Sequence, residues 1–208
     1  MISPRFGALL AEEDLKGKAV LDVGCGGGRL AFLLAPRCRR VIGIDRDAQA
    51  VARAHERALA TGAENVEFRE ADAEAIEYDQ FAPQLVVAHL CMSDAIIARA
   101  GRALAPGDCL AFVAFHVDQW RETGRPSRFA YEGERLSSVL RANGFLPEHL
   151  EVEQDVGRFA SVEEGLAAAV GLEAKWRADG RWQRYVAFLE GGGRTLTRSH
   201  LIVKARRQ

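Results

Sequence analysis

A carboxylate followed by a turn almost without side chains is the first feature of the sequence that could do chemistry. Asp22 lies in the apolar run 19–23. The turn after it consists of Gly24, Cys25, Gly26, Gly27 and Gly28. Such a turn can take positive φ and lets a ligand approach bare backbone, and the helix expected over 28–35 points its free N–H groups back at the turn. The pattern therefore predicts a site for the polar or anionic end of a small molecule.

The spacing of the glycines and of the residues next to them distinguishes between the known kinds of nucleotide-type site. A P-loop needs Gly-Lys-Ser/Thr after its glycines, but Gly28 is followed by Arg29 and Leu30. The dinucleotide fingerprint G-x-G-x-x-G, started at Gly24, would place its third glycine where Arg29 stands. Both patterns fail, and Asp22-x-Gly24-x-Gly26-x-Gly28 remains.

Further polar residues stand at the ends of later predicted strands. They are Asp45, with Arg46 directly after it, Asp72 with Ala73, His89 and His116. Because the carboxyl ends of parallel strands meet at one edge of a sheet, we expect these residues to lie near the glycine turn. Each acid alone would equally fit a helix cap.

The D-x-G-x-G-x-G run resembles motif I of the class I S-adenosylmethionine-dependent methyltransferases. The resemblance implies that the turn from Gly24 to Gly28, Cys25 included, lies under the methionine part of the cofactor. It implies that Asp22 helps to hold the methionine ammonium, and that Asp45 binds both ribose hydroxyls, with Arg46 beside it. A carboxylate suits that task because its oxygens only accept and ribose offers two adjacent donors.

The resemblance extends to two later positions. Asp72 and Ala73 match the adenine-reading position, and His89 matches the space between sulfonium and methyl acceptor. Methyl transfer needs no metal, and much of its rate can come from alignment. Where the acceptor must lose a proton, His89 and His116 are the candidate general bases, since histidine can accept a proton near neutral pH.

Strands that alternate with helices predict an α/β fold with a doubly wound, mostly parallel sheet. The resemblance implies a seven-stranded, Rossmann-like methyltransferase sheet whose last strand is antiparallel. The expected strands are 19–23, 40–45, 65–70, 85–89, 109–115, 145–152 and 196–205. Helices are expected over 4–16, 48–60, 94–104 and 131–142, and the second presents an apolar face of Ala48, Val51, Ala52, His55, Ala58 and Leu59.

Residues 1–208 are expected to form one domain with a helical insertion over 157–193. Ser161 and Glu164 form a capping box that starts a helix. A second helix carries Trp182, Tyr185, Val186 and Leu189 at helical spacing. Glycines flank the insertion, so it could be a roof or lid over the active site. The alternative is a helical pair that only covers the sheet edge.

The composition of the chain limits the classes of binding partner that we expect. The net charge of −1 gives no bias toward nucleic acid, and no run of 18 apolar residues predicts a membrane span. The four cysteines form no C-x-x-C pair, so we expect neither a zinc site nor disulfides, but reduced thiols in a cytoplasmic protein. A monomer and a homodimer both remain open.

The sequence after the fourth strand, His89-Leu90-Cys91-Met92, lacks the motif of amino-methylating nucleic-acid enzymes. The chain looks most similar to the small-molecule branch, such as the quinone- and biotin-pathway methyltransferases. We therefore expect a methyltransferase that converts S-adenosylmethionine to S-adenosylhomocysteine while methylating a small molecule. The alternatives are a non-catalytic S-adenosylmethionine-binding protein, acting as a sensor or partner subunit, and a nicotinamide-dependent oxidoreductase.

Overall fold

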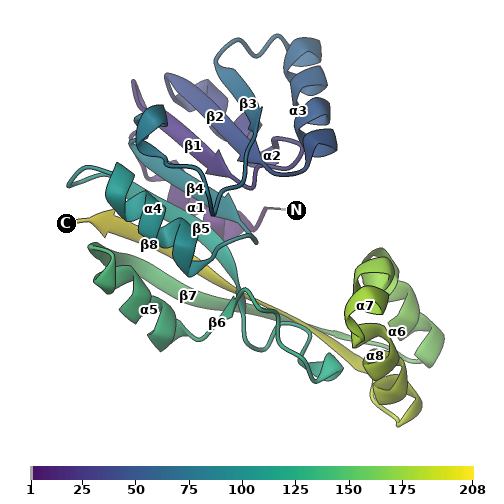
Figure 1. Cartoon of the computed structure of the whole chain (residues 1–208). Coiled ribbons are helices and arrows are strands. Elements are labelled where there is room, and N and C mark those ends of the chain that lie inside the picture. Colours follow the sequence, from purple (N-terminus) through teal and green to yellow (C-terminus); the bar gives the residue numbers. More distant parts are fainter. Residues whose placement is uncertain (1) are drawn as a thin grey trace. The chain divides into compact units, whose positions relative to one another are not determined.

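A computed structural model describes residues 2–208 and shows strands that alternate with helices (Figure 1). The first half contains α1 (Pro4–Ala11), β1 (Ala19–Val23), α2 (Arg29–Leu34), β2 (Arg40–Asp45), α3 (Ala48–Thr61), β3 (Val66–Glu70), β4 (Leu85–His89) and α4 (Asp94–Ala103). The second half contains β5 (Cys109–His116), β6 (Ala130–Tyr131), α5 (Gly133–Ala142), β7 (Phe145–Arg158), α6 (Val162–Ala169), α7 (Glu173–Asp179), α8 (Arg181–Glu190) and β8 (Thr195–Arg207).

The strands form one sheet in the order β3-β2-β1-β4-β5-β8-β7, and the short β6 pairs with β5 beside this path. Strands β1 to β5 run parallel, with Asp22 of β1 opposite Gly43 of β2 and Val87 of β4. The end of β8 lies opposite the start of β5, because the Arg207 N–H donates to the Asp108 carbonyl at 2.9 Å. The predicted α/β fold with a mostly parallel sheet and an antiparallel last strand is confirmed.

Of the residues that the structure describes, the first compact unit contains 2–114, 133–151 and 202–208. Its central strands β1, β4 and β5 are buried along nearly their whole length. Helices α1, α2 and α3 pack on one face of the sheet through Phe6, Leu30 and Val51. Helices α4 and α5 lie on the opposite face from α1 (Figure 1). Strands covered on both faces explain the continuous apolar runs in the sequence.

The second compact unit contains residues 115–132 and 152–201. The predicted insertion folds here as three helices, α6 to α8, and not as a pair. Ser161 starts α6 as expected, since its Oγ accepts the Glu164 N–H at 3.2 Å. The aromatic side chains form the core of the unit. The Trp176 ring lies 5.3 Å from that of Trp120 and 5.5 Å from that of Tyr185.

Two helices differ from their predictions. The first ends at Ala11 and does not continue to residue 16. In α3 the structure buries Ala50, Val51 and Ala54 and packs the partly buried Ala58 against the core, whereas Leu59 is 84% exposed. Of the predicted apolar face, Val51 and Ala58 are confirmed, and Ala48, Ala52 and Leu59 are exposed. Alanine occupies many positions of α3 and fits either face, so its spacing carried little information. Among residues 2–208, no helix has the length and apolar character to cross a membrane.

Candidate functional site

The glycine turn joins β1 to α2 and is fixed to the neighbouring strand. Gly24, Gly26 and Gly28 all have positive φ, at 64°, 51° and 74°. The Cys25 N–H donates to the Ile44 carbonyl of β2 at 3.0 Å. Glycine takes this left-handed backbone without the steric cost that other residues pay. The turn is therefore a rigid part of the sheet edge.

The glycines of the turn serve two different purposes. A Cβ on Gly24 would lie 2.5 Å from the Cys91 Sγ, and one on Gly28 would lie 2.7 Å from the Phe68 ring. By contrast, a Cβ on Gly26 or Gly27 would meet no atom within 4 Å. The first two glycines are required by packing, and the other two leave a stretch of backbone open to an approaching ligand.

Asp45 ends β2 and is held against this open stretch. Its Oδ2 accepts the Gly26 N–H at 2.8 Å, and its Oδ1 accepts the Asp47 N–H at 2.9 Å. An ionised carboxylate has about four acceptor positions, so about two remain for a ligand. Asp47 caps α3, since its Oδ1 accepts the Gln49 N–H at 3.0 Å. Asp47 therefore caps α3, and the carboxylate of Asp45 remains available to accept hydrogen bonds from a ligand.

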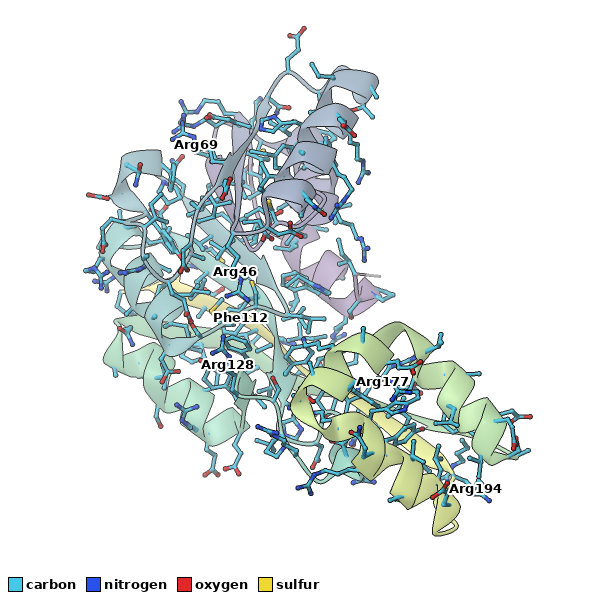
Figure 2. The ribbon with its side chains drawn as sticks, turned by 45° about the vertical axis from the view of Figure 1, so that its right-hand side comes forward. Arg46, Arg69, Phe112, Arg128, Arg177 and Arg194 are labelled. Atoms are coloured by element: carbon cyan, nitrogen blue, oxygen red, sulfur yellow. The ribbon has the colours of Figure 1, made fainter. Side chains whose placement is uncertain are left out.

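Arg46 stands between these two acids. It is exposed, and Figure 2 shows its side chain on the loop that follows β2. The contact of Arg46 with a cofactor, which the sequence leads us to expect, stays a prediction.

Asp22 lies below the turn and is almost fully buried, with 1% of its surface exposed. Its Oδ2 accepts the Ala31 N–H at 3.0 Å, which ties β1 to α2. Burial raises the pKa of Asp22 to about 7, the Ala31 hydrogen bond opposes this shift, and the charge of Asp45 adds to it. A cation brought into the turn would favour the ionised form of this carboxyl.

Asp72 and Ala73 lie in the loop after β3. The Ala71 N–H donates to the Asp45 carbonyl at 2.9 Å, which joins this loop to the end of β2. The Asp72 Oδ1 accepts the Glu74 N–H at 2.8 Å. The Tyr78 hydroxyl donates to the Ala73 carbonyl at 2.7 Å, and Tyr78 is buried. Sequence reasoning missed Tyr78, and its only signal was an aromatic residue in a polar loop.

His89 ends β4 at the same sheet edge. Its ring centroid lies 6.5 Å from that of Phe6 in α1. The next residue, Leu90, has φ of 64°, which is unusual for a side chain of this size. The Leu90 N–H donates to the Val113 carbonyl at 2.7 Å, and the Cys91 thiol donates to the Val23 carbonyl at 3.1 Å. Leu90 and Cys91, which sequence reasoning did not use as site residues, thus shape the wall beside Gly24.

His116 lies in the second unit, in a network of that unit's own side chains. Its Nδ1 lies 3.0 Å from the Ser199 Oγ and 3.7 Å from the Asp118 Oδ2. The Gln119 Oε1 accepts the Ser199 N–H in the same network. These contacts orient the imidazole, and a catalytic role for His116 stays a prediction.

The structure brings most of the predicted site together within the first unit. Asp22, Asp45, Ala73 and His89 all stand at the carboxyl edge of β1 to β4, around the glycine turn. Two fixed carboxylates beside open backbone can bind a ligand that offers hydroxyl and amino donors. The groups fit the nucleoside and amino-acid ends of S-adenosylmethionine.

Comparisons with known proteins agree with this geometry. A family model described as a methyltransferase domain matches residues 14–167. The ubiquinone biosynthesis O-methyltransferase of Leptothrix cholodnii is 36% identical over 99 residues, which cover 45% of this chain and 42% of that protein. The matched stretch is thus less than half the length of this curated relative.

Two solved structures share the fold over almost the whole chain. The YcgJ protein of Bacillus subtilis has a TM-score of 0.79 at 14% identity and covers 99% of both chains. The [4+2]-cyclase SpnF has a TM-score of 0.69 at 27% identity and covers 98% of this chain and 80% of its own.

Proposed function

Because the chain belongs to the methyltransferase domain family, we propose that it transfers a methyl group from S-adenosylmethionine to a small-molecule acceptor. The observation that carries this proposal is the pairing of Asp45 with the glycine turn. The carboxylate accepts the Gly26 N–H at 2.8 Å beside backbone that no side chain covers. This geometry supports a ribose bound at Asp45 and a methionine moiety on the turn.

Each end of the cofactor has a candidate partner. The free acceptor positions of Asp45 suit the two ribose hydroxyls, and each such charge-assisted bond contributes about 1.5–3 kcal/mol. Asp22 suits the methionine ammonium, and Asp72 suits the adenine amino group. The backbone of Ala73, fixed by Tyr78, faces the adenine ring.

When bound, the cofactor supplies an activated methyl group. The residues of the chain hold and align the reactants, which can supply about 7–11 kcal/mol of the barrier. His89 at the end of β4 takes the acceptor proton where one must leave, since a neutral imidazole accepts a proton near pH 7. Relatives named ubiquinone biosynthesis O-methyltransferases support a small molecule as acceptor and oxygen as the methylated atom.

A second candidate is binding of S-adenosylmethionine without methyl transfer. The similarity to a protein named as a [4+2]-cyclase covers 98% of this chain, so the fold alone does not fix the reaction.

Measurement of methyl transfer distinguishes a methyltransferase from a protein that only binds S-adenosylmethionine. The protein is incubated with methyl-labelled S-adenosylmethionine and a bacterial small-molecule extract, and S-adenosylhomocysteine and labelled products are quantified. We expect both to form in equal amounts with the wild type and to decrease with Asp45→Ala. Binding of the cofactor without S-adenosylhomocysteine formation in any fraction would favour the second candidate.

A further inference from the structure

An open groove of about 610 Å³ lies in the first unit beside the glycine turn. Ile2 and Ser3 line it before α1 begins, α1 provides Pro4 and Gly7, and α2 provides Arg29 and Leu33. No residue of the predicted cofactor site lines this groove. Its volume is within the range of small-molecule pockets, about 300–1,000 Å³.

The walls of the groove are mostly apolar and leave room for a ligand. Leu33 is 48% exposed, although it belongs to a helix whose other leucines are buried. Ile2 packs against the core from the other wall. A Cβ on Gly7, which also lines the groove, would meet no atom within 4 Å. An apolar ligand would gain free energy by covering Leu33 and Ile2.

Arg29 gives the groove a positive charge without a counterion. It is exposed, follows Gly28 directly and stands one helical turn before Leu33. Within residues 2–208, its guanidinium forms no hydrogen bond or ion pair. No acidic side chain lines the groove. A guanidinium in this setting favours a planar anion such as a carboxylate, which it can bind through two parallel hydrogen bonds.

The groove adjoins the proposed reaction site at the start of α2. Arg29 adjoins Gly28 of the turn, and α1 contacts the end of β4 through the Phe6 and His89 rings, 6.5 Å apart. Phe6 is fully buried, so α1 is firmly attached at this position. A molecule that contacts Arg29 in the groove would therefore lie next to the glycine turn, and α1, which forms the other wall of the groove, is fixed against the end of β4.

We propose that this groove seats the methyl acceptor, and that the acceptor is an organic acid with an apolar body. The body lies against Ile2 and Leu33, and the carboxylate pairs with Arg29. This assignment of substrate class rests on the proposed function, whereas binding of an organic acid in the groove can be measured without turnover.

The charge preference is tested with a matched pair of probes, 2-naphthoate and its neutral amide 2-naphthamide. Both are titrated into protein with ¹³C-labelled isoleucine and leucine methyl groups in the presence of S-adenosylhomocysteine. We expect naphthoate to shift the Ile2 and Leu33 methyl signals and to bind about three- to fivefold more tightly than the amide, as for an exposed ion pair. Arg29→Gln should abolish this preference, and Arg53→Gln, on an exposed part of α3, should preserve it.

The apolar part is tested with Gly7→Leu, which fills the groove. Both probes should lose most of their affinity, while the melting temperature does not fall, because leucine favours a helix more than glycine does, and the affinity for S-adenosylhomocysteine stays within error of the wild type. Equal binding of the two probes, or methyl shifts that leave Ile2 and Leu33 unchanged, would overturn the proposal. If the wild type binds naphthoate as expected but not S-adenosylhomocysteine, the proposed function fails and the acid site remains.

Discussion

The Asp45 Oδ2 accepts the Gly26 N–H at 2.8 Å, so the acid that ends β2 is fastened to the turn that follows β1. The carboxylate and the open glycine backbone are thereby held in one fixed relation before any ligand arrives. Preorganisation of this kind lowers the entropic cost of binding.

Tyr78→Phe should weaken cofactor binding and the fold by about the same free energy. The hydroxyl fixes the Ala73 carbonyl at 2.7 Å, and its loss frees the loop that is proposed to read adenine. We expect about a fivefold lower affinity for S-adenosylhomocysteine and about 1 kcal/mol less stability, measured by calorimetry and urea unfolding. Tyr185→Phe, which removes a hydroxyl from the second unit, is the matched control and should leave the affinity unchanged.

The two kinds of glycine in the turn should respond differently to alanine. Gly24→Ala places a methyl group 2.5 Å from the Cys91 Sγ at a positive φ, and we expect a loss of about 2 kcal/mol or more in stability. Cys91→Ala should restore part of it.

Gly27→Ala meets open space, so stability should change by less than about 0.5 kcal/mol. Its affinity for S-adenosylhomocysteine should nevertheless fall at least about tenfold, because crowding by one methyl group costs about 1–3 kcal/mol. An unchanged affinity would mean that the open backbone is not the ligand face.

Asp22 should make stability depend on pH. Burial raises its pKa from 3.8 to about 7, so the native state keeps this proton at pH values where the unfolded chain has released it. Its contribution to stability therefore falls as pH rises from about 4 to about 7 and is constant above that window. Asp22→Asn should remove this slope in thermal unfolding between these pH values.

The same carboxyl gives a binding signature. If the methionine ammonium lies beside Asp22, binding favours the ionised form, and the protein releases a proton when it binds S-adenosylhomocysteine near pH 6. Calorimetry in buffers of different ionisation enthalpy measures that proton. The release should disappear in Asp22→Asn, and its persistence there would assign it to another group.

Much of the fold could be predicted because its signals are local. The apolar runs of β2 and β4 end at Asp45 and His89, where the predicted strands end. The spacing of Asp22 and the glycines identified the turn because a backbone with positive φ at alternate positions accepts few residues other than glycine.

Other features could not be predicted, since they depend on contacts distant in sequence. Cys91 leaves no room for a side chain at Gly24, although the two residues are 67 positions apart in the sequence. Tyr78 reaches Ala73 across an irregular loop that has no periodicity. Trp176 in α7 is fully buried, but α7 has only seven residues, too few for a clear helical period.

We propose that Asp45 and the glycine turn together bind S-adenosylmethionine. Calorimetric titration of S-adenosylhomocysteine into the wild type, Asp45→Ala and the neighbouring Asp47→Ala tests it most directly. We expect micromolar binding that falls at least about tenfold in Asp45→Ala and is preserved in Asp47→Ala, whose side chain caps α3 and lies near Arg53 of the same helix. Absence of binding to the wild type, or equal affinity in the wild type and Asp45→Ala, would contradict it.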